Sequence, residues 1–299
     1  MSEEQTQRTL GPSGSNTSNR SPDRQRGHVE IAKTGTVSAD YLAVTELAGD
    51  EVSREQIERL CRRYYWAGDY CRGRDVAEVA CGTGQGLGYL AALAKSLRAG
   101  DHSDEILAIA RGHYGDRVRL EHFDAQQLPY GDQSFDVVVI FEAIYYLGSI
   151  ERFLGECRRV LRPGGMLLIA TANKDLFDFS PSPLSVRYYG VVELGETLAR
   201  HGFAVEFFGD TPVDTVSWRQ RVLRPVKKLV VASGIMPKSM AGKKLLKRLV
   251  FGGLVKMPAE ITASMVPYQP PARLTVGEPD RHHKVILCAA TSNNSTALR

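Results

Sequence analysis

The chain has 299 residues, of which 43% are hydrophobic and 24% are charged, and its net charge is +4 at pH 7. This balance is typical of a globular protein and excludes fibrous and compositionally disordered classes. No apolar run approaches the roughly 18 residues of a membrane span, and the N-terminus lacks the apolar region of a secretory signal. The five cysteines form no C-x-x-C pair, which predicts reduced thiols and no metal site. We therefore expect a cytoplasmic protein.

The N-terminal part divides into a tail and a helical segment. Residues 1–27 are almost devoid of apolar side chains and are expected to form a disordered tail. Residues 28–72 are expected to form an N-terminal helical cap. Within it, Ser53 and Gln56 have the spacing of a capping box. Ile57, Leu60 and Tyr64 follow near helical spacing.

The stretch from Asp75 to Gly88 organises the rest of the chain. It runs from a short apolar strand through a glycine-rich turn into a helix, which is the opening of a nucleotide-binding α/β unit. The dinucleotide fingerprint G-x-G-x-x-G fails, because its third glycine is replaced by Leu87 or Tyr89 in the two frames. An acid, Glu78, instead stands four residues before the first turn glycine.

The segment Glu78-Val-Ala-Cys-Gly-Thr-Gly84 resembles motif I of the class I S-adenosylmethionine-dependent methyltransferases, (D/E)-x-(G/A)-x-G-x-G. Ala80 occupies a position where glycine is commoner. The resemblance implies S-adenosyl-L-methionine as cofactor and a binding turn made of Glu78, Ala80, Cys81, Gly82 and Gly84. In related proteins the preceding helix lines the methionine end of the cofactor, which implies a role for Tyr64. Core packing is the alternative for Tyr64.

Two later motifs extend the resemblance. Ser96–Asp101 is interpreted as the second strand, and Asp101 lies nineteen residues beyond Gly82, near the spacing at which an acid meets ribose hydroxyls. Asp101-His-Ser is similar to the family's D-x-S, which implies cofactor contacts for Asp101 and His102; a turn or cap acid is the alternative. The run from Asp124 to Val138 is similar to D-A-x-x-L-P-F-x-D-x-x-F-D-x-V, which implies that Asp124 and Ala125 hold the adenine amino group.

The next strand ends where open α/β folds bind ligands. Val137–Phe141 is a continuous apolar run typical of a central parallel strand, and Phe141 closes it at the cofactor site. Glu142 follows, near the expected position of the transferring methyl group. The family often has histidines where this chain has Tyr145 and Tyr146. Glu142 and Tyr146 are therefore the catalytic candidates, with a structural helix-capping acid as the alternative for Glu142.

The resemblance covers about residues 60–210 and the last strand. It implies an α/β fold with a Rossmann-like, seven-stranded, mostly parallel sheet, helices on both faces and a helical insertion before the last strand. The expected core comprises residues 73–210, followed by a basic helical insertion or lid at 211–282 and the last strand and tail at 283–299. Residues 215–259 contain eleven Lys and Arg and no Asp or Glu. A solvated lid is one reading of this segment; an anionic acceptor or an anionic membrane surface is the other.

The function predicted from these motifs is methyl transfer to an O or N atom of a small-molecule acceptor, either anionic or a natural-product or sugar-type metabolite. The alternatives are C-methylation of a small or lipid-like acceptor at a membrane surface, a nicotinamide-dependent oxidoreductase, and a non-catalytic Rossmann-like binding protein. Nucleic acid is a less favoured partner, because Pro267-Tyr-Gln-Pro-Pro271 does not match the D/N-P-P-Y motif of amino-methylating DNA enzymes.

Overall fold

The computed structural model describes residues 45–182, 184–213 and 253–293. These residues all belong to the compact unit that spans Val37–Arg299. The tail expected at 1–27 and most of the basic insertion, residues 214–252, lie outside the described residues.

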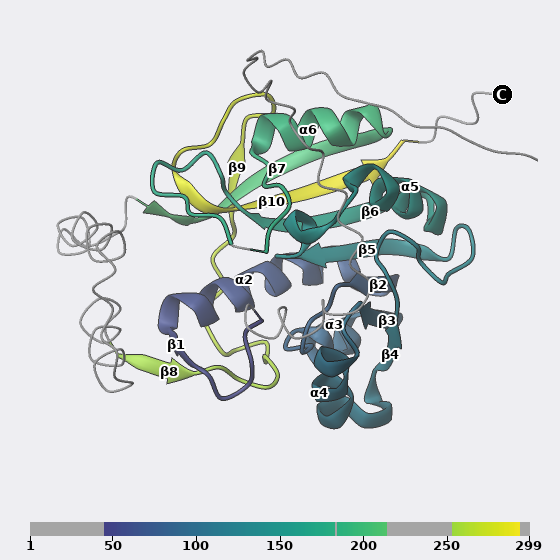
Figure 1. Ribbon diagram of the computed structural model, residues 1–299, viewed down its shortest axis with the longest axis vertical. Helices are drawn as coiled ribbons and strands as arrows, with labels where there is room; N and C mark the ends of the chain where they lie inside the picture. The colour runs from purple at the N-terminus through teal and green to yellow at the C-terminus, as the bar shows by residue number, and fades with distance from the viewer. Residues whose placement is uncertain (1–44, 183, 214–252, 294–299) are drawn as a thin grey trace, which may run out of the picture. The chain divides into compact units, whose positions relative to one another are not determined.

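An eight-stranded sheet with the order β4-β3-β2-β5-β6-β10-β7-β9 forms the centre of the fold (Figure 1). Its strands are β2 (Asp75–Val79), β3 (Ser96–Asp101), β4 (Arg119–His122), β5 (Phe135–Phe141), β6 (Leu161–Ala172), β7 (Phe203–Pro212), β9 (Ala272–Leu274) and β10 (His283–Ser292). The pairings among β4, β3, β2, β5 and β6 are parallel, whereas β10 is antiparallel to both β6 and β7. The seven expected strands are thus present, and β9 adds an eighth at the edge.

The helices begin where the sequence supplies caps. Ser53, Ser103 and Ser149 cap α2 (Arg54–Cys71), α4 (Asp104–Tyr114) and α5 (Ile150–Val160), each accepting a backbone N–H bond in the first turn. The predicted capping box of Ser53 and Gln56 is confirmed. The remaining helices are α3 (Leu87–Leu93) and α6 (Val191–Arg200), and short 3-10 turns cover Gly115–Arg117 and Ile144–Tyr146.

Helices cover both faces of the sheet because β5 is apolar on both. Val138 and Ile140 belong to a core cluster with residues of α5 and α6. Val137 and Val139 belong to a second cluster with residues of α2. Figure 1 shows α2 and α6 on opposite faces. Alternating side chains of a strand point to opposite faces, so one apolar run anchors both helical layers.

The described part of the expected helical insertion is not helical. Residues 253–282 form β8 (Leu254–Lys256), β9 and connecting loops. β8 pairs with β1 (Glu51–Ser53) in a separate two-stranded sheet. The backbone bond from Gly49 N–H to the Met257 carbonyl, 2.8 Å, extends this pairing. Residues 253–282 therefore return to the segment before α2, and within this described part β9 is the strand that joins the main sheet.

Candidate functional site

A cavity of about 530 Å³ opens at the carboxyl ends of the parallel strands. Its wall comes from α2 and from the residues that follow β2, β3, β4 and β5. Of the thirteen residues predicted for the site, twelve line it: Tyr64, Glu78, Ala80, Cys81, Gly82, Asp101, His102, Asp124, Ala125, Phe141, Glu142 and Tyr146. Gly84 does not. The cavity volume is in the range of small-molecule and cofactor sites.

The turn after β2 is built from residues in the left-handed region. Ala80, Gly82 and Gly84 have φ values of 53°, 60° and 82°, and such values are costly for residues with a Cβ atom. The positive φ of Ala80 explains why glycine is commoner there. A Cβ on Gly82 would meet only the Thr45 methyl group at 3.9 Å, so Gly82 faces open space.

Gly84 does not line the cavity, and its predicted contact with the cofactor stays a prediction. A Cβ on Gly84 would lie 2.9 Å from Leu87 and 3.1 Å from the ring of Tyr114. The Tyr114 hydroxyl also donates a 2.6 Å hydrogen bond to the Gly84 carbonyl. Gly84 therefore lets the turn fold back onto α3 and α4, and Gly82 is the glycine that borders the cavity.

Glu78 is a buried acid with one free oxygen. Its side chain is only 1% exposed, and its Oε1 accepts a 2.6 Å hydrogen bond from the Tyr64 hydroxyl. Its Oε2 is buried without a hydrogen-bond partner. Burial raises the pKa of Glu78 to about 7. Tyr64 is also packed edge-on against Phe141, with ring centroids 5.1 Å apart. Tyr65 and Trp66, by contrast, are core residues.

Asp101 joins two elements of the site. Its Oδ2 accepts from the Gly82 N–H at 2.9 Å, and its Oδ1 accepts from the Ser103 N–H at 3.0 Å. The carboxylate thus fixes the glycine turn and caps the loop before α4. Asp101 therefore lines the cavity and also acts as a cap acid. A carboxylate has about four lone-pair sites, so two remain for a ligand.

Asp124 and Ala125 line the cavity in a tight turn. The Asp124 Oδ1 accepts from the Gln126 N–H at 2.8 Å, and the Asp124 carbonyl accepts from Gln127 N–H at 2.9 Å. His102, beside them in the wall, stacks on His122 with ring centroids 5.9 Å apart. Contact between these residues and an adenine group stays a prediction.

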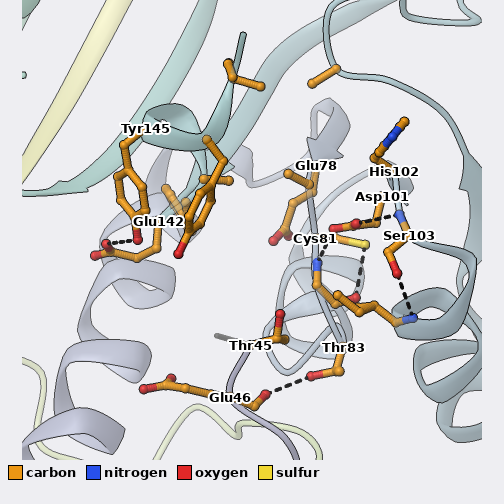
Figure 2. A pocket seen from close by; sticks show the side chains of 18 of the residues that line it. Thr45, Glu46, Glu78, Cys81, Thr83, Asp101, His102, Ser103, Glu142 and Tyr145 are labelled. Carbon is orange, nitrogen blue, oxygen red and sulfur yellow. Dashed lines mark hydrogen bonds between the residues drawn. The ribbon is translucent and has the colours of Figure 1, made fainter. Parts of the chain in front are cut away.

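Glu142 occupies a strained position at the end of β5. Its φ is 52°, a value that for a non-glycine residue occurs preferentially at functional sites. Its Oε2 accepts a 3.2 Å hydrogen bond from Tyr145, and its Oε1 lies 3.8 Å from Nη1 of Arg63. Figure 2 shows Glu142 and Tyr145 pointing toward one another at the cavity wall. The carboxylate keeps 26% exposure, so an acceptor can reach it.

Two parts of the cavity wall are not predicted from the sequence. Arg59 and Arg63 of α2 line the cavity, and their i, i+4 spacing in the helix was the signal that could have revealed them. Thr45 and Glu46 form the other part. The Glu46 carbonyl accepts from Thr83 Oγ1 at 3.2 Å (Figure 2). It also accepts from Gln85 Nε2 at 2.7 Å. We call Thr45 and Glu46 the strap, because these bonds hold them against the glycine turn. No periodic pattern in the sequence predicts it.

Across the described ranges, no group of three His, Cys, Asp or Glu side chains could hold a metal ion. No helix in the same ranges is both long and apolar enough to cross a bilayer.

Comparisons with known proteins agree with this site. The family described as "Methyltransferase domain" matches residues 77–169. A protein of Mycolicibacterium smegmatis named "Probable S-adenosylmethionine-dependent methyltransferase" is 39% identical over 140 residues, 46% of this chain and 54% of that protein. The O-methyltransferase cnsE of Penicillium expansum is 30% identical over 219 residues, 68% of this chain and 72% of that protein. The chain spans about half the length of the first of these relatives.

A solved structure shares the fold. The S-adenosylmethionine-dependent methyltransferase of Thermotoga maritima described as a "possible histamine N-methyltransferase" has a TM-score of 0.51 at 16% identity, covering 80% of this chain and 96% of that one. Fold and cavity together define a Rossmann-like protein with a cofactor-sized site at the carboxyl edge of its sheet. Within that class, the glycine turn and the relatives identify the family: the chain belongs to the S-adenosylmethionine-dependent methyltransferases.

Proposed function

We propose that this protein transfers the methyl group of S-adenosylmethionine to an oxygen or nitrogen atom of a small-molecule acceptor. The observation that carries the proposal is the position of Glu142. Its partly exposed carboxylate lines the same cavity as the glycine turn, and it is oriented by Tyr145 and Arg63.

The residues of the cavity fit the cofactor. Glu78 offers a buried oxygen without a partner, which a donor from the methionine or ribose part of the cofactor would satisfy. Gly82 leaves room for close approach to the backbone. Asp101 has lone pairs left for ribose hydroxyls, and Arg63, beside Tyr64 on the helix that lines the methionine end in related proteins, offers a cation for the methionine carboxylate.

When bound, S-adenosylmethionine supplies a methyl group that its sulfonium already activates. The chain therefore contributes mainly position and orientation, for which effective molarities can reach about 10⁵ M or more. Glu142 takes up the proton that an acceptor hydroxyl or ammonium releases. Tyr145 holds the carboxylate in place, and burial raises the pKa of its phenol, so it stays protonated and keeps donating.

Carbon methylation, or action on an acceptor at an anionic membrane surface, would involve the same cavity with a different partner. The basic segment 215–259, which motivates the membrane version, lies almost wholly outside the described residues. Membership of the methyltransferase family disfavours the nicotinamide-dependent oxidoreductase, as does the failed dinucleotide fingerprint.

The proposal is tested by measuring cofactor binding and product formation. Calorimetry should give binding of S-adenosylmethionine and S-adenosylhomocysteine but not of NADH. A panel of hydroxyl, amine and activated-carbon compounds should then be screened for formation of S-adenosylhomocysteine. Turnover with at least one hydroxyl or amine compound, lost in Glu142→Gln, is expected. Binding of NADH with no binding of S-adenosylmethionine would overturn the proposal.

A further inference from the structure

The wall of the cavity that α2 supplies carries two arginines on one face. Arg59 and Arg63 are four residues apart in this helix, so their side chains project from neighbouring turns, and both line the cavity. The other arginines of α2 have different surroundings: Arg54 is exposed, and Arg62 pairs with Asp210 of β7 at 3.3 Å.

The two arginines differ in their ion-pair partners. Arg63 has a carboxylate partner in Glu142, 3.8 Å from its Nη1, although its Nε is buried without a hydrogen-bond partner. Arg59 forms no ion pair or hydrogen bond with another residue of the described ranges, and its Nε is buried without a hydrogen-bond partner. A buried guanidinium nitrogen that gives up water without gaining an acceptor is costly. The arrangement therefore points to an anion that arrives from outside the chain.

The position of each side chain along α2 indicates whether the cofactor or the methyl acceptor carries that anion. Tyr64 is bonded to Glu78, inside β2, and Arg63 lies at Glu142, just beyond the end of β5. The backbone of Arg59 is four residues closer to the start of α2, about 6 Å further along the axis. Arg59 is thus one helical turn away from Arg63 and from the Tyr64–Glu78 bond, and it still lines the same cavity.

The charges around Arg59 restrict the kind of anion. Glu46 and Glu142 also line the cavity and interact electrostatically with Arg63, and Arg59 interacts electrostatically with Glu55, one turn earlier in α2. These acids repel any anion, but they repel a phosphate dianion more strongly than a carboxylate, which carries one charge and matches the planar fork of a single guanidinium. Tyr145 and Tyr146, with ring centroids 4.6 Å apart, offer an apolar surface in the same cavity.

We propose that Arg59 binds a carboxylate of the methyl acceptor, so that the acceptor is a carboxylic acid with an apolar body that rests on Tyr145 and Tyr146. This inference rests on the proposed function, because it assigns the substrate class of the same site. Arg59 acts as a specificity-determining residue: it fixes the distal end of the acceptor while the methylated atom lies at Glu142.

The test uses the full chain loaded with S-adenosylhomocysteine and a set of hydroxylated aromatic and aliphatic carboxylic acids, each beside its primary amide and its phosphate-ester counterpart. Calorimetry should show binding of one or more acids with a preference of tenfold or more over the matched amide. Arg59→Gln should remove that preference, Arg59→Lys should retain part of it, and Arg54→Gln, which deletes the same charge from an exposed site of the same helix, should leave it unchanged.

The outcomes separate this inference from the proposed function. If neither S-adenosylmethionine nor S-adenosylhomocysteine binds the parent protein, the proposed function fails. If the cofactor binds but acids and amides bind alike, or phosphate esters bind better than acids, the carboxylate assignment is wrong. If Arg59→Gln and Arg59→Lys both weaken cofactor binding tenfold with unchanged circular dichroism, Arg59 serves the cofactor and the inference is overturned, while the proposed function stands.

Discussion

The hydroxyl oxygen of Tyr64 lies 2.6 Å from Oε1 of Glu78, and both side chains are buried against the cavity. This bond joins α2 to β2 across the second core cluster. It also explains why Tyr64 lines the cavity as well as the core: its ring packs on Phe141, and its hydroxyl orients the acid whose other oxygen has no hydrogen-bond partner. A Cβ on Gly86 would lie 2.1 Å from the Tyr64 ring, so this ring also fixes the glycine turn.

The elevated pKa of Glu78 predicts a pH dependence of cofactor binding. With a pKa of about 7 in the free protein, Glu78 is mostly protonated at pH 6 and mostly ionised at pH 8. An ionised carboxylate is the better acceptor for donors of the cofactor, so affinity for S-adenosylmethionine should rise about tenfold between these values and proton release should accompany binding below pH 7. Calorimetry in two buffers of different ionisation enthalpy measures both quantities.

The matched control is Glu78→Gln, which keeps the shape and removes the titration. Its cofactor affinity should be nearly independent of pH over the same range. Tyr64→Phe deletes a bond that lowers the pKa of Glu78, so the rise in affinity should shift to higher pH. A parent protein with the same pH profile as Glu78→Gln would show that Glu78 does not titrate on binding.

The same group makes a prediction about stability without cofactor. Because the folded pKa of Glu78 is raised above its ordinary 4.5, its contribution to stability is fully present below about pH 4.5 and is lost as pH rises through about 7. The loss amounts to roughly 3 kcal/mol at about 1.4 kcal/mol per pKa unit. Urea unfolding between pH 5 and 8 should show the parent losing stability relative to Glu78→Gln. Parallel curves for the two proteins would contradict this.

Much of the core could be predicted because its signals are local. The capping box of Ser53, the strand over Ser96–Asp101 and the apolar run into Phe141 depend on neighbouring residues, and the structure has each of them. Gly100 weakens a strand by propensity, yet a Cβ there would lie 2.2 Å from the ring of Phe123. The weak strand former is thus required by close packing, which a single sequence does not reveal.

The missed features depend on contacts between distant segments. The strap at Glu46 bonds to Thr83 and Gln85, about forty residues away. β8 and β9 are three residues each, too short for a periodic pattern. The orientation of α2 decides that Arg59 and Arg63 face the cavity, while Tyr65 and Trp66 face the core. Helical spacing groups these residues but does not say which group meets a ligand.

The glycine turn yields a prediction that distinguishes fold from binding. Gly84→Val should lower the free energy of unfolding by more than about 2 kcal/mol, because its Cβ would press on Leu87 and Tyr114 in a left-handed position. Gly82→Val meets open space, so its stability loss should be limited to backbone strain of about 1–3 kcal/mol, while its branched side chain enters the cavity and abolishes cofactor binding.

Denaturant unfolding and calorimetry on the same preparations separate the two effects. Gly84→Ala, whose smaller Cβ meets the same atoms, serves as the graded control. Normal cofactor affinity in a folded Gly82→Val protein would remove this turn from the site.

Substitution of Asp101 should affect both the affinity for the cofactor and the hydrogen bonds of the glycine turn. Asp101→Asn keeps an oxygen for one of the two N–H groups of Gly82 and Ser103 but directs an NH₂ group at the other. Affinity for S-adenosylmethionine should fall by about 1–3 kcal/mol, the scale for unpaired buried groups. Ser103→Ala, which removes the cap of α4 but leaves Asp101 in place, should lower stability by about 1 kcal/mol with little change in affinity. Equal affinity in the parent and Asp101→Asn would contradict a ribose contact.

Glu142 and Tyr145 yield the prediction that bears most directly on catalysis. If Glu142 takes the acceptor proton, Glu142→Gln should lower kcat by about 10²-fold or more while the dissociation constant for S-adenosylmethionine changes little.

Tyr145→Phe leaves the carboxylate in place but removes the bond to its Oε2, so its kcat should fall less, by about tenfold. Tyr146→Phe is the comparison variant, since it removes a neighbouring phenolic hydroxyl that donates a 3.4 Å hydrogen bond to Ser182. Single-turnover measurement of S-adenosylhomocysteine formation isolates the chemical step from product release. A Glu142→Gln protein that turns over at the parental rate would show that the acceptor loses its proton to water or to another group, and the role of Glu142 would then be limited to binding.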